Sequence, residues 1–235
     1  MPQVGIVNFG PGPYTSERGY RGEELAALLA ELTGRPWEIM HTFDTPNPPP
    51  GNDRFPSDYA RWLHDSGALT QIGAGQLDIV LAWSDDHGHF YEHVTHGPRW
   101  QVVNDTNLPD VGRTYSVLGL NIQRSTWEGL QQCLHSATHW AESCFIRLVP
   151  GEFRAWCGNW ALHEHVPLNE VAPADLLAEY PAYAGTCHFP PGASRHYQYD
   201  GPDCAAWSGD HEQYLRRWWG MLRAEHDGWL DLLWD

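Results

Sequence analysis

Short apolar segments alternate with amphipathic segments over the first third of the chain, and this alternation restricts the fold more than any other feature. Apolar runs at residues 4–9, 37–43 and 77–83 suit strands. Between the first two runs, leucines recur every three or four residues over 25–32, as they do on one face of a helix. Strands separated by helices pair in parallel through right-handed crossovers. We therefore expect an α/β fold whose N-terminal half is a mostly parallel sheet flanked by helices, with residues 100–103 as a fourth strand.

The pattern of apolar residues changes after about residue 112. Residues 127–142 have helical periodicity, and two apolar runs follow at 145–149 and 153–162, separated by Pro150-Gly151. Proline followed by glycine suits a type II turn, so the two runs predict an antiparallel hairpin. Asp210 is in the right place to cap a final helix that carries Tyr214, Trp218 and Leu222.

The C-terminal half is thus expected to add a hairpin, loops and helices to the sheet. No linker of distinct composition separates residues 1–112 from residues 113–235. We therefore predict a single domain over residues 1–235.

The charged residues are strongly unbalanced. The chain has 30 Asp plus Glu against 14 basic residues, a net charge of −16, and every basic residue is arginine. The absence of lysine excludes Schiff-base chemistry and phosphate-loop or kinase-type lysines. A surface this acidic repels nucleic acid and anionic membranes, because phosphate binding requires a cationic face. The partner we expect is a small neutral or cationic substrate.

The cysteines and the apolar runs bear on the compartment. The N-terminus has no cationic start followed by an apolar run of signal length, and nowhere do 18 apolar residues occur in succession. The five cysteines form no CxxC pair. We therefore expect a cytoplasmic protein with reduced thiols and no membrane span.

The densest group of chemically useful side chains follows the third predicted strand. Ligands of parallel sheets bind beyond the carboxyl ends of the strands, and this strand runs directly into residues 84–93. Imidazoles and carboxylates are ligands that Zn²⁺ and Fe²⁺ accept. Our candidates are His87, His89 and His93 as metal ligands, with Asp86 or Glu92 as the residue that orients a ligand or acts as general base. The alternative is a solvated acidic loop.

Two further histidine pairs have the spacing of metal ligands. His135 and His139 are four residues apart on the predicted helix, hence on one face. This spacing matches the HExxH of zinc proteases, but Ser136 stands where the general-base glutamate should be, so no role is carried over from those enzymes. His163 and His165 alternate on or after the predicted hairpin. Each pair suits either metal ligands or a buried, hydrogen-bonded couple.

Three other residues are candidates for binding substrate. Arg113 and Arg124 can hold a carboxylate through two hydrogen bonds, although pairing with a structural Asp or Glu is the alternative. His188 lies beside the Pro190-Pro191-Gly192 turn, which either shapes a pocket or is merely packed. Cys187 and His188 do not suit a nucleophile and its base, because residues adjacent in sequence rarely face each other.

Two functions from different classes fit these residues. The first is a metal-dependent enzyme, hydrolytic by preference, although Fe²⁺-dependent oxygenation suits the same ligands. The second is a carbohydrate-binding or small-molecule-binding module, or a metal-free enzyme, that uses exposed aromatic faces. The tryptophans available for stacking are Trp156, Trp160, Trp207, Trp218 and Trp219.

Overall fold

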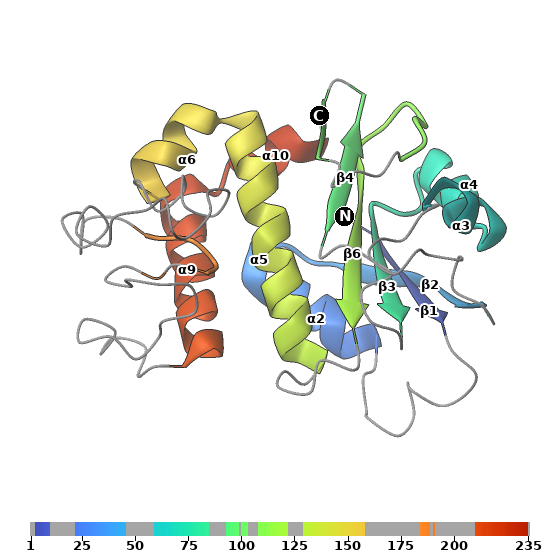
Figure 1. Ribbon diagram of the computed structural model, residues 1–235, viewed down its shortest axis with the longest axis horizontal. Helices are drawn as coiled ribbons and strands as arrows, with labels where there is room; N and C mark the ends of the chain where they lie inside the picture. Colours follow the sequence, from blue (N-terminus) through green and yellow to red (C-terminus); the bar gives the residue numbers. More distant parts are fainter. Residues whose placement is uncertain are drawn as a thin grey trace, which may run out of the picture. The chain divides into compact units, whose positions relative to one another are not determined.

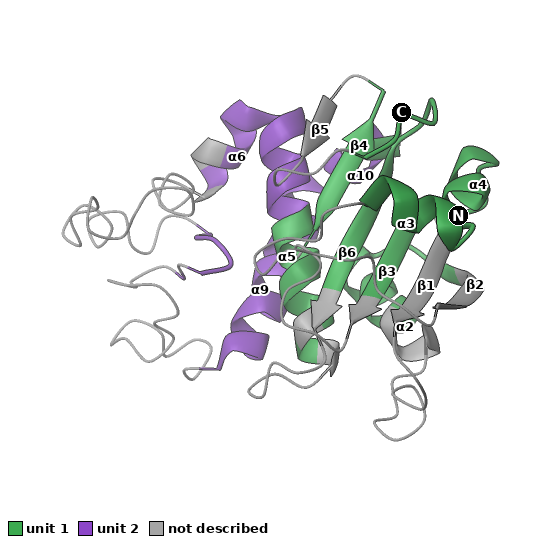
Figure 2. Cartoon of the chain, turned by 45° about the vertical axis from the view of Figure 1, so that its right-hand side comes forward, with its two compact units in different colours: residues 1–140, 233–235 green, residues 141–232 purple. Residues whose placement is uncertain are grey.

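The computed structural model describes several stretches of the chain: residues 3–9, 22–45, 59–84, 93–98, 100–102, 108–121, 129–157, 184–188, 190 and 210–234 (Figure 1). The chain divides into two compact units, residues 1–140 with 233–235 and residues 141–232 (Figure 2). This division does not test the predicted single domain, which stays a prediction. Among the described helices, none combines the length and the apolar composition needed to cross a membrane.

A mixed sheet forms the centre of the first unit. Its strands are ordered β2-β1-β3-β6-β4-β5. The first four in this order are parallel, whereas β4 is antiparallel to both β6 and β5. Their bounds are β1 Gln3–Phe9, β2 Glu38–Thr45, β3 Ile79–Ser84, β4 Val94–Gly97, β5 Trp100–Val102 and β6 Tyr115–Asn121. The predicted α/β class is therefore confirmed, but the described sheet is mixed rather than mostly parallel throughout.

Two of these strands, β4 and β6, are not predicted from the sequence, and β5 joins the sheet through one of them. The expected fourth strand does form at β5, but it pairs antiparallel with β4, with Val102 opposite Thr95. Thr95 in turn lies opposite Ser116, near the start of β6. The carboxyl end of β5 is therefore level with the beginning of β6 and not with the carboxyl edge of the parallel strands.

Short helices pack one face of the sheet. Helices α3 (Tyr59–Asp65) and α4 (Ala68–Gly73) contribute apolar side chains to a buried cluster with alternate residues of β3 and β6. The alternation follows from the two-residue period of a strand, which sends successive side chains to opposite faces. The cluster includes Tyr59, Trp62, Leu63, Ala68, Ile72, Val80, Ala82, Val94, Tyr115 and Val117.

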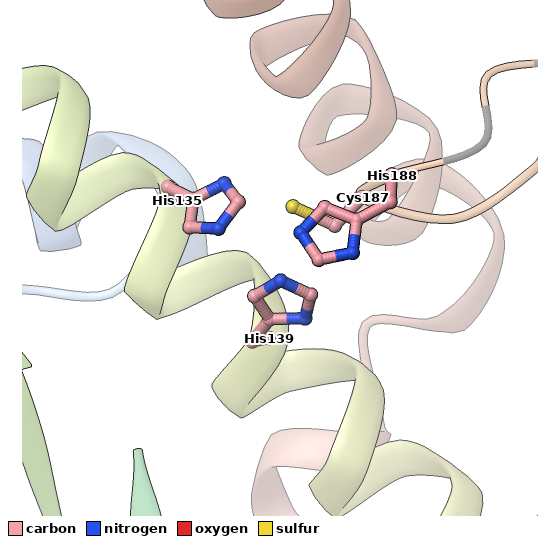
Figure 3. A group of neighbouring side chains, drawn as sticks. All are labelled: His135, His139, Cys187 and His188. Carbon is pink, nitrogen blue, oxygen red and sulfur yellow. The ribbon is translucent and has the colours of Figure 1, made fainter. Parts of the chain in front are cut away.

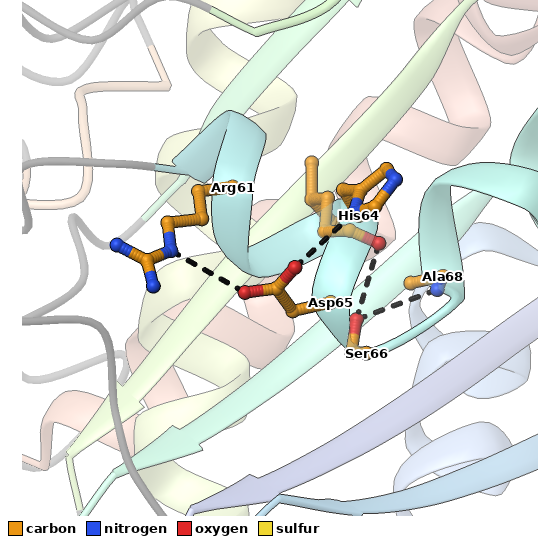
Figure 4. Close-up of polar contacts among 6 residues, drawn as sticks. Arg61, His64, Asp65, Ser66 and Ala68 are labelled. Carbon is orange, nitrogen blue, oxygen red and sulfur yellow. Dashed lines mark hydrogen bonds and ion pairs between the residues drawn. The ribbon is translucent and has the colours of Figure 1, made fainter.

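The turn between α3 and α4 is held by local polar contacts (Figure 4). The Ser66 hydroxyl donates to the Leu63 carbonyl and accepts from the Ala68 amide, both at 3.3 Å. Asp65 contacts His64 at 3.1 Å and Arg61 at 3.4 Å. The His64 hydrogen bond holds the pKa of the Asp65 carboxyl below its ordinary value, although these three side chains are exposed. The turn is thus satisfied by its own residues.

The opposite face of β6 receives the long helix α5 (Gly129–Leu148). The Ser136 hydroxyl donates to the Gly119 carbonyl at 3.1 Å, and Trp140 Nε1 donates to Ser116 Oγ at 3.0 Å. Ser136 and Trp140 are four residues apart and therefore share a face of the helix. Because the later helical residue contacts the earlier strand residue, α5 runs antiparallel to β6. Helix α2 (Gly22–Thr33) also belongs to this unit and ends, as predicted, at the positive-φ Gly34.

In the second unit, aromatic side chains form the core around the end of α5. Helices α6 (Pro150–Cys157), α9 (His211–His226) and α10 (Trp229–Trp234, whose last residues belong to the first unit) follow it. The ring centroid of Phe145 lies 5.6 Å from that of Phe153 and 6.0 Å from that of Trp156. Trp156 is in turn 5.2 Å from Trp218. Asp210 caps α9 by accepting from the Gln213 amide at 3.1 Å, as the sequence predicts.

The predicted hairpin is wrong, because residues 145–148 continue α5 and residues 150–157 form α6. The amide of Val149 bonds to the Phe145 carbonyl at 2.9 Å, and the amide of Phe153 bonds to the Val149 carbonyl at 3.0 Å. Pro150 is the first residue of α6, where its missing N–H costs no hydrogen bond. The Pro-Gly pair therefore starts a helix instead of making a turn between strands.

Candidate metal centre

The topology of the first unit places a switch point between β1 and β3. Strand β2 lies on one side of β1 and β3 on the other, with Phe9 opposite Ser84 at their carboxyl ends. Ligands of open α/β sheets bind in the crevice at such a point. The segment that follows β3 up to residue 92 lies outside the described residues. The roles expected for Asp86, His87, His89 and Glu92 stay predictions, as do those of Arg124, His163 and His165, which also lie outside the described residues.

His93 is described, and it is buried directly before β4. Because Val94 lies opposite Val117, His93 approaches the middle of β6 and not the carboxyl edge of the sheet. It does not belong to the group of possible metal ligands found among the described residues. Its expected role as a ligand stays a prediction.

Arg113 lies at the other end of the parallel strands. Its guanidinium forms an ion pair with Asp78, which directly precedes β3, and Nη1 donates to the Ile72 carbonyl at 3.3 Å. The side chain is 30% exposed and that of Asp78 is 11% exposed. The structure therefore places Arg113 in a contact that ties the end of α4 to β3, and its expected role in substrate binding stays a prediction.

Four possible metal ligands meet beside α5 (Figure 3). One ligand atom from each of His135, His139, Cys187 and His188 lies within 4.8 Å of those of the other three. The first three residues are buried, whereas His188 is only partly buried. The centroids of the two α5 imidazoles are 4.7 Å apart, with their planes at 84°. This buried His/Cys cluster can hold a metal ion.

The helix itself explains why two imidazoles meet here. His135 and His139 are four residues apart, so successive turns stack them on one face of α5. Each directly precedes a residue that contacts β6, namely Ser136 and Trp140. A step of one residue rotates a helix by about 100°, so the imidazole face is turned away from the sheet-facing stripe.

The other two possible ligands come from residues 184–188, which have no regular secondary structure. Side chains of two helices hold the backbone of this segment. The Cys187 amide donates to Glu142 Oε1 at 2.6 Å. The Tyr214 hydroxyl lies 2.8 Å from the Thr186 carbonyl oxygen, and Trp218 Nε1 donates to the Gly185 carbonyl at 3.1 Å. The positive φ of Gly185, 75°, suits this compact path.

The donor set decides which ions are suitable. Imidazole nitrogen and thiolate sulfur suit Zn²⁺ and Fe²⁺, whereas Mg²⁺ and Ca²⁺ prefer oxygen ligands. Zn–N and Zn–S bonds of about 2.0 and 2.3 Å put the ligand atoms of a tetrahedral site with one thiolate roughly 3.3–3.5 Å apart. A maximum separation of 4.8 Å therefore requires only small side-chain movements for the group to close around an ion.

Sequence reasoning finds part of this group. His135 and His139 are predicted as ligands, and the structure brings them together with His188, which is predicted to bind substrate. Cys187 is missed. The sequence signal for it is its place beside His188, and the structure puts both residues in the group that can hold a metal ion.

Comparisons with family models, with curated proteins and with solved structures find nothing that matches this chain. The function is therefore inferred from the site alone.

Proposed function

We propose that this protein is a metal-dependent enzyme that hydrolyses a small neutral or cationic substrate. The observation that carries the proposal is the meeting of four ligand atoms within 4.8 Å of one another. In the proposed centre, His135, His139 and Cys187 hold Zn²⁺ or Fe²⁺. Three protein ligands leave one coordination position for water, which is the arrangement of catalytic metal sites.

We assign His188 to the fourth coordination position, where it alternates with water. It is the only member of the group that is partly exposed, so solvent and substrate approach the ion from its side. A bound metal lowers the pKa of its water toward about 7, so that hydroxide is available near neutrality. The net charge of −16 favours the approach of cationic substrates over anionic ones.

The proposed hydrolysis also needs a general base. Ser136 does not supply one, because its hydroxyl donates to the Gly119 carbonyl on the side of the sheet. Asp86 and Glu92 stay our candidates, since a carboxylate in a partly dry site can act as base near neutral pH.

The metal centre is tested by metal analysis of protein purified without a polyhistidine tag. We expect about one equivalent of zinc or iron per chain. The double variant H135A/H139A loses it, and the control H64A, which removes an exposed histidine, retains it. Wild-type protein that neither contains a metal nor binds added Zn²⁺ or Fe²⁺ would overturn the proposal.

Hydrolysis is tested separately with uncharged and cationic chromogenic esters and amides. We expect turnover that a chelator abolishes and that added metal restores. A metal-loaded protein that cleaves none of these substrates overturns the hydrolase but leaves the metal centre. Oxygen consumption by the Fe²⁺ form with an organic co-substrate would instead favour an oxygenase.

The aromatic alternative receives less support from the described residues. Trp156, Trp218 and Trp219 are 7%, 0% and 1% exposed, so they are core residues and present no face to a ligand. Trp160 and Trp207 lie outside the described residues. The stacking platforms expected from the sequence therefore rest on those two residues.

A further inference from the structure

We infer that Glu142 is a positioning residue of the metal centre, which fixes the backbone at Cys187 and thereby sets the affinity for thiolate-preferring ions. This inference rests on the metal centre of the proposed function and does not depend on which reaction the centre performs. Neither the donor set nor the spacing of the histidines assigns a role to this carboxylate.

The first observation is the place of Glu142 on α5. It follows His139 by three residues and His135 by seven, so the three side chains form one stripe along the helix. Glu142 is 5% exposed. A buried carboxylate is costly unless hydrogen bonds satisfy it, so its place here requires a partner.

The second observation is that partner. Glu142 Oε1 accepts from the Cys187 amide at 2.6 Å, and this contact is buried. Fixing the amide of a residue fixes the direction of its Cα–Cβ bond within the narrow range that the backbone allows. The carboxylate of α5 therefore aims the thiol that completes the ligand set of the same helix.

The two residues before the cysteine are held from α9. Tyr214 and Trp218 bond the carbonyls of Thr186 and Gly185. Glu142 contacts the amide of the cysteine itself. Without it, the backbone amide of Cys187 loses its acceptor while the preceding residues stay in place.

The consequence for the metal is a change of donor set. With the thiolate in place, the group combines soft sulfur with imidazole and selects Zn²⁺ or Co²⁺ over oxygen-preferring ions. Residues that orient the ligands of a metal typically contribute 10–100-fold to its affinity. We expect a loss of this size when the amide contact is removed, together with loss of the thiolate–metal bond.

The test is Co²⁺ substitution of the full-length chain, read by absorbance. Wild-type protein shows a near-ultraviolet thiolate-to-cobalt charge-transfer band, and C187S lacks it, which assigns the band to this cysteine. E142A is expected to bind Co²⁺ and Zn²⁺ 10–100-fold more weakly, by competition with a chelator, and to lose most of the band. E142Q keeps an oxygen acceptor and is expected to recover both. E212A, which removes a partly exposed carboxylate on α9, is the matched control and changes neither.

The outcomes separate this inference from the proposed function. Wild-type protein that binds no Co²⁺ or Zn²⁺ overturns the metal centre itself. If wild-type protein shows the band and E142A shows the same band and the same affinity, the role of Glu142 alone is overturned. If E142A does not fold, E142D carries the test, because a side chain shorter by one methylene cannot keep the 2.6 Å contact. E142D that folds and matches wild type in band and affinity overturns the inference as well.

Discussion

Replacing Gly75 by alanine tests whether Arg113 is a structural anchor. Gly75 has φ of 75°, and a Cβ there would lie 2.8 Å from Arg113 Nη1. The left-handed conformation costs a residue with a Cβ about 1 kcal/mol. The Cβ also displaces the guanidinium from Asp78 and from the Ile72 carbonyl. A hydrogen bond to a charged group is worth about 1.5–3 kcal/mol, and partial exposure reduces this to roughly 1 kcal/mol here.

We therefore expect G75A to lower the free energy of unfolding by about 2 kcal/mol. The matched control is G67A, because Gly67 has φ of 78° with nothing within 4 Å of its Cβ position. Only the conformational cost of about 1 kcal/mol applies there. Urea unfolding followed by tryptophan fluorescence measures both, provided that the m-value does not change.

A double-mutant cycle completes the test. In an R113M background the displaced contact is already absent, so G75A should then cost no more than G67A. Equal costs of the two glycine changes in the wild-type background would refute the reasoning. So would an excess cost of G75A that persists in R113M. A raised KM of R113M with unchanged stability would instead favour the substrate-binding role.

Three further predictions concern the metal, a buried thiol and a buried indole. Removing the metal with a chelator lowers the free energy of unfolding by about 4 kcal/mol relative to protein in free metal at 1,000 times Kd; an unchanged Tm on chelation of metal-loaded protein would contradict this. Burial raises the pKa of the Cys133 thiol from 9.0 to about 12, so the folded state holds a proton that the unfolded state loses above pH 9. The free energy of unfolding thus falls as pH rises from 9 to 12. Between pH 8 and pH 10 this fall should be about 1 kcal/mol smaller for C133A than for wild type, as measured by urea unfolding. Equal falls in the two proteins would refute the assignment. W140F removes the donor to Ser116 Oγ and should cost about 1–3 kcal/mol, seen as a lower urea midpoint; a midpoint equal to that of wild type would show that the bond contributes nothing.

The parts of the fold that the sequence predicts are those with local signals. Helix α2 is predicted from its leucine spacing and ends at Gly34, where only glycine adopts φ of 69° at little cost. The last helix begins at the predicted cap, Asp210. The run at 77–83 is recognisable as a strand because it is apolar on both faces, as buried parallel strands are.

The errors arise where local signals are ambiguous. Pro150-Gly151 satisfies a type II turn and also the first turn of a helix, and only the packing of Phe145 against Phe153 and Trp156 selects the helix. Strand β6 carries serine, glycine and asparagine among its apolar residues, which conceals a strand that its neighbours bury. Tertiary contacts decide both cases.

Local signals also predict only part of the candidate site. His135 and His139 are linked by helix geometry alone, so their proximity follows from their spacing. The Cys187 amide donates to the Glu142 side chain across segments that are distant in sequence, and the sequence contains no signal for this contact. When possible ligands lie both on a helix and in an irregular segment, the sequence predicts the proximity of those on the helix alone.

On helix α5, each imidazole of the candidate site directly precedes a side chain that contacts β6. A rotation of the helix that moved either imidazole would also pull Ser136 from Gly119 and Trp140 from Ser116. The directions in which the two imidazoles point are therefore held by contacts with a strand that carries neither of them. Redesign of the proposed centre for a larger cation therefore has to take Ser116 and Gly119 into account as well as the histidines.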